Sequence, residues 1–327
     1  MKVLTMRKPV ITSLPAIANM NAILGHYEDK YWPWFVQNHI QLVGWDNPEL
    51  YVQFYYPLFR KHYPLLSNQT LNKKYVQRMG EDMAEVFMDF LDDDQYIYLS
   101  VDTYYIPAYK NANQYHHPHD MLIYGYDSKR KRFMIADFFN GSYEFTEASF
   151  EEVLQAVNSS HCEDEYFNHI QLLKYNPNEA FTLDMQHISL MLNDYLTSYK
   201  TSSRYKMVEE PGKDTDAWGI SVFDILKKNL QDHSSANIRS LHLLWDHKVA
   251  MTYLVNYLGA EGKLRHYKAA ANDYAEIETE ALVIRNLGLK YNMNNSNVLF
   301  DGLLTRLTKL KEKESDAIKR LLDLINE

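Results

Sequence analysis

One histidine and one acid, placed a hairpin's length apart, are the residues of this chain best suited to proton transfer. His119 opens an apolar stretch that ends at Asp127, and Asp137 lies near the end of the next apolar stretch. Two such stretches joined by a short charged turn predict an antiparallel hairpin, which can bring the two side chains within hydrogen-bond reach. A carboxylate in that place fixes the tautomer of an imidazole and raises its basicity. The spacing therefore predicts a general base made of His119 and Asp137.

Two other interpretations of this region stay open. In the first, His119 is structural, and a backbone carbonyl satisfies its ring. In the second, residues 116–120 bind a metal, since three histidines and Asp120 are suitable donors. Neighbouring residues of one loop rarely all point inward, however, and no distant His or Cys stands out as a completing ligand. We expect no metal and no other cofactor.

The single cysteine is a weaker candidate for nucleophilic catalysis. Cys162 directly follows His161, but residues 163–165 are all acidic. Neighbouring negative charge raises the pKa of a thiol and makes the thiolate scarcer. We therefore expect an incidental surface cysteine. One cysteine also excludes an internal disulfide framework and a multi-cysteine zinc site.

Composition limits the classes of partner. The 327 residues carry a formal net charge of −9 at pH 7, which disfavours nucleic acid, because nucleic acid requires a basic face. No segment approaches the roughly 20 apolar residues that a membrane helix needs. The first residues lack the apolar stretch of a signal peptide. We expect a cytoplasmic protein that binds neither a membrane nor nucleic acid.

The pattern of elements changes near Pro177. Before it, short apolar strands alternate with helices, which are expected to begin near Ala18 or Asn19, to span 70–91, and to start again at Ser149. After it, the apolar spacing predicts only helices, over 181–199, 219–231, 235–258, 262–288 and 296–325, with a linker over 201–215. The expected fold class is α+β. Residues 1–177 would form a domain with an antiparallel sheet and residues 178–327 an all-helical domain.

Several stretches of the first domain resemble one known family. Residues 101–107, 119–127, 135–139 and 150–154 are similar to the N-terminal domain of the butirosin biosynthesis protein H-like family. The resemblance implies a papain-like cysteine-peptidase fold and a place in nonribosomal peptide or polyketide biosynthesis. It also implies acyl transfer from the phosphopantetheine thioester of an acyl or peptidyl carrier protein to a small-molecule amine. The helical half is similar to the second domain of that family.

The chain departs from the family at the nucleophile. The resemblance makes His119 the base and Asp137 its orienting acid, and it places a catalytic cysteine at the start of the first buried helix. The matching residues, 14–24, contain no cysteine, and Ser13 comes too early.

The first hypothesis is therefore an acyltransferase in which a general base lets an amine attack the thioester directly. The alternative is an inactive homologue that serves as a carrier-protein or peptide binding module. Asn19, Asp102, Tyr104 and Tyr105 are the residues expected to bind substrate. A homodimer is compatible with the sequence.

Overall fold

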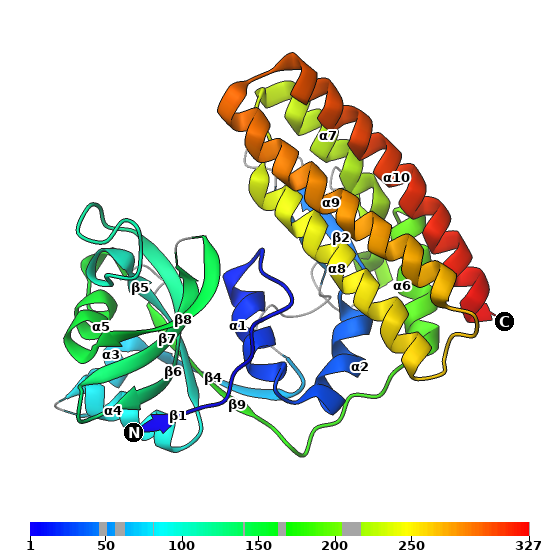
Figure 1. Cartoon of the computed structure of the whole chain (residues 1–327). Helices are drawn as coiled ribbons and strands as arrows, with labels where there is room; N and C mark the ends of the chain where they lie inside the picture. Colours follow the sequence, from blue (N-terminus) through cyan, green and yellow to red (C-terminus); the bar gives the residue numbers. More distant parts are fainter. Residues whose placement is uncertain are drawn as a thin grey trace. The chain divides into compact units, whose positions relative to one another are not determined.

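The chain folds as two compact units. The computed structural model describes residues 1–45, 51–55, 63–80, 82–139, 141–162, 168–204 and 217–326. One unit comprises Met1–Tyr31 and Lys61–Phe181, and the other comprises Trp32–Arg60 and Thr182–Glu327 (Figure 1). The sequence predicted a single boundary after residue 177. The structure instead groups residues 32–60 with the helical unit, because the strands in that segment pair with each other and with a strand after residue 216.

The first unit is built on a seven-stranded antiparallel sheet with the order β4-β9-β5-β6-β7-β8, and β1 pairs with β6. This confirms the predicted α+β class and antiparallel sheet. The strands are β1 (Lys2–Val3), β4 (Leu66–Asn72), β5 (Tyr96–Asp102), β6 (Pro118–Asp127), β7 (Arg132–Phe139), β8 (Ser142–Ser149) and β9 (His169–Tyr175).

Helices cover both faces of this sheet. Helices α4 (Met83–Asp92) and α5 (Phe150–Val157) lie on one side, and α1 (Pro15–Leu24) lies on the other (Figure 1). Apolar contacts among Phe87, Phe133 and Phe150 join α4 and α5 to β7. The short helix α3 (Lys73–Val76) and the 3-10 turns η1 (Thr103–Tyr105) and η2 (Ser160–Cys162) complete the unit. The predicted capping box at Ser149 is present, with Glu152 as its partner.

The single helix predicted over residues 70–91 is wrong at its start and in its continuity, because residues 70–72 are strand and two separate helices, α3 and α4, follow. Residues 66–72 form β4, which pairs with β9 along its whole length. Only the second half is a long helix, and it begins where the Asp82 side chain accepts a hydrogen bond of 2.8 Å from the backbone N–H of Ala84. Pairing with a distant strand, which local periodicity cannot report, overrides the helical spacing of the apolar residues.

The second unit is mostly helical but contains a small sheet. Its long helices confirm the predicted ones: α6 (Met185–Thr197), α7 (Val222–His233), α8 (Ile238–Ala260), α9 (Lys268–Asn294) and α10 (Asn297–Asn326). An additional helix, α2 (Glu28–Asn38), begins in the first unit. The strands β2 (Leu42–Trp45), β3 (Tyr51–Phe54) and β10 (Ala217–Trp218) form an antiparallel sheet in the order β10-β2-β3, so the unit is not all-helical. Of the predicted linker, residues 201–204 form a 3-10 turn (η3), and the rest lies outside the described residues.

A buried ion pair lies at the centre of the second unit. Lys248 Nζ on α8 lies 2.7 Å from Glu314 Oε1 on α10, and both side chains are fully buried. Tyr195 on α6 accepts a hydrogen bond from this ammonium at 3.0 Å and donates one to Glu314 at 3.1 Å. The charges thereby connect three helices through satisfied hydrogen bonds.

None of the helices in the described part of the chain combines the length and the apolar character that a membrane span requires.

Candidate functional site

His119 and Asp137 form a hydrogen-bonded pair, here called the dyad. His119 is the second residue of β6, and Asp137 lies on its neighbour β7. The Nδ1 atom of His119 is 2.7 Å from Oδ2 of Asp137, so the predicted contact is present. The Asp137 side chain is fully buried, whereas that of His119 remains 29% exposed. A fixed carboxylate therefore supports an imidazole that solvent reaches.

The geometry fixes which nitrogen of His119 can act as a base. Nδ1 also lies 3.0 Å from the backbone carbonyl oxygen of Asp120. Both of its partners are acceptors, so Nδ1 carries the proton and Nε2 keeps the lone pair. Burial alone lowers the pKa of His119, but the hydrogen bond and negative charge of Asp137 outweigh it and raise that pKa above its ordinary value. Nε2 is consequently a strengthened proton acceptor.

Tyr109 is a third member of this site. Its hydroxyl donates a hydrogen bond to the same Oδ2 of Asp137 that His119 contacts. Burial, together with the charge of Asp137, raises the pKa of Tyr109 well above its ordinary value, so the phenol stays a neutral donor. The other carboxylate oxygen, Oδ1, is buried and accepts no hydrogen bond within the described residues. Tyr109 therefore shares with His119 the stabilisation of the carboxylate.

Asn19 lies on α1, at a distance from the helix start. The helix begins at Pro15, not at residue 18 or 19 as expected, because proline is favoured in the first turn and Leu14 takes the extended cap position. Asn19 is fully buried, and its Oδ1 accepts a hydrogen bond of 2.6 Å from the Tyr143 hydroxyl. Its Nδ2 has no partner among the described residues. The buried amide thus keeps its NH₂ group, with two N–H donors, for a further acceptor.

No cysteine stands where α1 begins, and the one cysteine of the chain is out of reach. Cys162 lies in η2 and is only 1% exposed. The expectation of a surface cysteine is wrong, because the turn after α5 folds this side chain inward. A thiol that solvent cannot reach is an inert, structural one. The dyad therefore has no thiolate partner in the described part of the chain.

A second histidine–carboxylate group lies at the same end of the sheet. We call Asp102, His116, Ser159 and His161 the Asp102 cluster. His116 Nδ1 is 2.7 Å from Asp102 Oδ2, and His161 Nδ1 is 3.5 Å from the same oxygen. The Ser159 hydroxyl donates a hydrogen bond of 2.6 Å to that oxygen. Asp102, His116 and His161 offer donor atoms within 4.8 Å of one another, which is close enough to hold a metal ion.

Backbone groups hold the Asp102 carboxylate in place. Its Oδ1 accepts hydrogen bonds of 3.1 Å from the N–H groups of Tyr104 and His117. Burial raises the pKa of Asp102. The hydrogen bonds that its carboxylate accepts from Ser159, His116 and the two N–H groups lower this pKa by more, so the net pKa lies below its ordinary value. Asp102 therefore remains a carboxylate inside the protein.

The four residues predicted to bind substrate do not lie together: Asn19 is near the dyad, and the other three are in or beside the Asp102 cluster. Tyr104 stacks on His116, with ring centroids 4.3 Å apart. Tyr105 and His116 line a pocket of about 550 Å³ with residues that follow α5. Asp102, Tyr104 and Tyr105 thus gather around His116, and Asn19 contacts Tyr143. The two groups are close in the sheet, because the β5–β6 register pairs Val101 with His119 and Asp102 with Pro118.

Sequence reasoning missed three members of these groups: Tyr109, Ser159 and His161. Tyr109 lies in a loop between β5 and β6, and nothing in its spacing marks it. Ser159 and His161 follow α5 in a polar stretch whose pattern points only to Cys162. They could have been found by asking which side chains donate hydrogen bonds to Asp102, since a buried carboxylate requires such donors.

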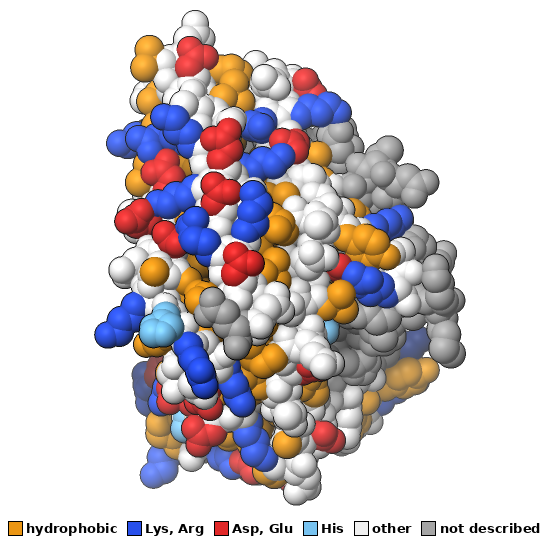
Figure 2. Space-filling view, turned by 90° about the vertical axis from the view of Figure 1, so that its right-hand side faces the viewer, with side chains coloured by type: hydrophobic (Ala, Val, Ile, Leu, Met, Phe, Trp, Pro, Cys, Tyr) orange, Lys and Arg blue, Asp and Glu red, His pale blue; other side chains and the backbone are white. Residues whose placement is uncertain are grey.

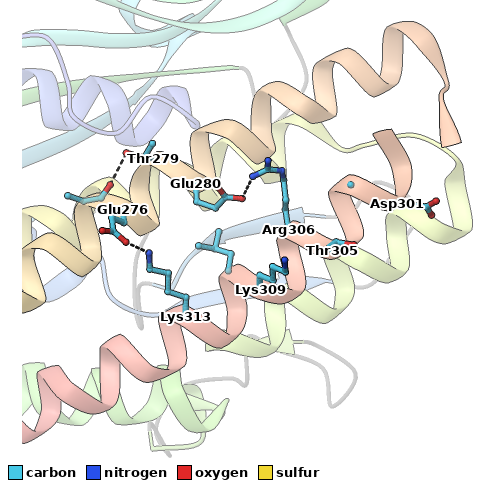
Figure 3. Close-up of a pocket in the computed structure, with 11 residues that line it drawn as sticks. Glu276, Thr279, Glu280, Asp301, Thr305, Arg306, Lys309 and Lys313 are labelled. Atoms are coloured by element: carbon cyan, nitrogen blue, oxygen red, sulfur yellow. Dashed lines mark hydrogen bonds and ion pairs between the residues drawn. The ribbon is translucent and has the colours of Figure 1, made fainter. Parts of the chain in front are cut away.

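The described part of the second unit has a charged groove between α9 and α10. Figure 3 shows its lining, in which Lys313 pairs with Glu276 and Arg306 pairs with Glu280. On the face shown in Figure 2, acidic and basic side chains are interspersed. The charges of these two ion pairs offset each other across the groove, and exposed pairs of this kind contribute little to stability.

No protein-family model matches the chain, and no curated protein matches it.

Proposed function

We propose that the first unit is a papain-like domain that forms an amide by acyl transfer from a carrier-protein thioester, with His119 as general base. The observation that carries this proposal is the orientation of the imidazole. Nδ1 is 2.7 Å from the buried Asp137 carboxylate, so the partly exposed ring offers Nε2 for proton transfer. The resemblance to the butirosin biosynthesis protein H-like family supplies the substrate class, and a cytoplasmic location is part of the proposal.

The proposed reaction needs one proton shuttle and no covalent enzyme intermediate. The amine attacks the thioester carbonyl, and Nε2 of His119 takes the proton that the nitrogen loses. Collapse of the tetrahedral intermediate breaks the C–S bond, and the imidazolium returns the proton to the leaving thiolate. The products are the amide and the carrier thiol. A thioester is already activated, so positioning and proton transfer can supply the acceleration.

The buried state of Cys162 supports direct attack over an acyl-enzyme route. It is 1% exposed, and a nucleophile must reach its substrate. We expect Cys162→Ser to retain amide formation, and intact-protein mass spectra to show no acylated enzyme during turnover. Acylated protein in wild type together with loss of activity in Cys162→Ser would instead assign cysteine chemistry.

The test is an aminolysis assay with an acyl-phosphopantetheine thioester and a panel of primary amines, followed by mass spectrometry. His119→Gln keeps a side chain of similar size but removes the base, and we expect the rate to fall by about 10²–10⁴. His117→Gln, on the exposed neighbouring position, is the matched control and should keep the wild-type rate. If wild type forms no amide but binds the acyl-carrier protein, and His119→Gln binds it equally well, the binding-module alternative takes the place of this proposal.

A further inference from the structure

We propose that Asp102, His116 and His161 bind a divalent transition-metal ion, for which Zn²⁺ is the ion of best fit. The site is separate from the dyad and does not depend on the proposed acyl transfer. It differs from the expectation of no metal, which was based on residues 116–120 alone. Its ligands come from three places in the chain: the end of β5, the loop before β6, and the η2 turn.

The three donor atoms lie within 4.8 Å of one another. His116 Nδ1 and His161 Nδ1 lie 2.7 Å and 3.5 Å from the same oxygen, Asp102 Oδ2. In a tetrahedral zinc site with bonds of about 2.0–2.1 Å, two donor atoms lie about 3.3 Å apart. The His161 distance matches this value. The His116 ring must withdraw by about 0.6 Å to replace its hydrogen bond with a metal bond, and its side chain, 36% exposed, has room to do so.

The groups behind the ligands are those of a prepared metal site. Asp102 Oδ1 is held by the backbone N–H groups of Tyr104 and His117, which leaves Oδ2 directed at the two imidazoles. Tyr104 stacks on the His116 ring, with centroids 4.3 Å apart, and such an outer contact orients a ligand. The His116 and His161 rings are themselves stacked, 4.2 Å apart at an interplanar angle of 6°. One imidazole must therefore turn out of this stack before both Nδ1 lone pairs, which lie in the ring planes, can point at one ion.

The chemistry of the donors selects the ion. Two imidazole nitrogens and one carboxylate oxygen suit Zn²⁺, Co²⁺ or Ni²⁺, whereas Mg²⁺ and Ca²⁺ prefer oxygen ligands only. Three protein ligands leave a fourth position open, as in zinc sites that bind water or a substrate oxygen. Both histidines also line the pocket of about 550 Å³, so the open position has space for a small oxygen ligand. The competing explanation is a hydrogen-bonded cluster that only satisfies the buried Asp102.

The test is titration of the metal-depleted full chain with Co²⁺, read by visible absorption, and with Zn²⁺, read by calorimetry. We expect one ion per chain and the intense visible bands of four-coordinate Co²⁺. Asp102→Asn, His116→Ala and His161→Ala should each weaken binding at least tenfold, and Ser159→Ala by about tenfold through the ligand that it supports.

His117→Ala is the matched control, because its ring is exposed and only its backbone N–H touches the cluster. It should bind like wild type, and Zn²⁺ should raise the melting temperature of both. Circular dichroism of each metal-free variant checks that it is folded. His161→Ala, which changes the most exposed ligand, is the variant least able to disturb the fold. If folded His161→Ala binds Co²⁺ as tightly as wild type, or if wild type binds no ion, the cluster is a hydrogen-bonded one and the proposal is overturned.

Discussion

The Nδ1 atom of His119 lies 2.7 Å from Oδ2 of Asp137, across two neighbouring antiparallel strands. Because the acid is fully buried and the imidazole is partly exposed, the pair joins a fixed negative charge to a ring that a substrate can reach. This relationship makes Nε2 of His119 the proton acceptor of the site. Four measurable consequences follow for the dyad, for Tyr109 and for the buried ion pair of the second unit.

Asp137→Asn should destabilise the protein more at pH 6 than at pH 9. The pKa of His119 is raised in the folded state, so the stabilisation from the charged pair is fully present below the unfolded pKa of about 6.5. It is lost as the pH rises through the folded pKa. Any weakening of the hydrogen bond that the Tyr109 hydroxyl donates to residue 137 is the same at both pH values and cancels in the comparison. Urea unfolding at the two pH values measures the difference.

Glu144→Gln is the control for that comparison, since Glu144 is exposed and lies opposite Asp137 on β8. Its effect on the free energy of unfolding should be small at both pH values. If Asp137→Asn lowers the free energy of unfolding equally at pH 6 and pH 9, Asp137 does not stabilise the protonated form of His119.

Tyr109→Phe should raise the pKa of His119 further. The Tyr109 hydroxyl and His119 share one oxygen of Asp137, so removal of the hydroxyl leaves the carboxylate as a stronger acceptor for the imidazolium. NMR titration of the His119 Cε1–H proton measures this pKa. Tyr105→Phe, on the neighbouring η1 turn, is the control and should leave it unchanged. A lowered His119 pKa in Tyr109→Phe would contradict the shared-oxygen arrangement.

Breaking the buried ion pair of the second unit should cost more than replacing it. Glu314→Gln leaves the fully buried Lys248 ammonium without its counter-charge, and we expect a loss of about 3–5 kcal/mol in the free energy of unfolding. The double variant Lys248→Met with Glu314→Leu removes both charges and should recover most of this loss. Urea unfolding of the second unit's helices, followed by far-ultraviolet circular dichroism, compares the variants. A double variant as unstable as Glu314→Gln would mean that the pair itself supplies the stability.

The parts of the site that the sequence revealed are those made by local contacts. His119 and Asp137 belong to one hairpin, so alternation and a short turn were enough to bring them together. The Asp102 cluster could not be found in this way, because Ser159 is 57 residues from Asp102 and reaches it only after α5 has crossed the sheet. Local spacing carries no information on such a contact.

The distinction between local and long-range contacts also explains the errors in the predicted fold. The long helices of the second unit were predictable because an apolar face repeats along each of them. The apolar spacing of residues 70–91 also fits a helix, yet residues 66–72 pair with β9. Likewise, β2 pairs with β10, which lies more than 170 residues further along the chain, and this draws residues 32–60 into the helical unit. Strand partners of this kind are tertiary information.

The most direct test of the account is the pH dependence of amide formation from an acyl-phosphopantetheine thioester, compared between wild type and His119→Gln. At a fixed concentration of the unprotonated amine, the wild-type rate should rise with pH through one ionisation above the ordinary histidine pKa of about 6.5 and then reach a plateau. His119→Gln should be slow and should lack that ionisation. Equal rates and equal pH profiles for the two proteins would contradict the assignment of His119 as the base.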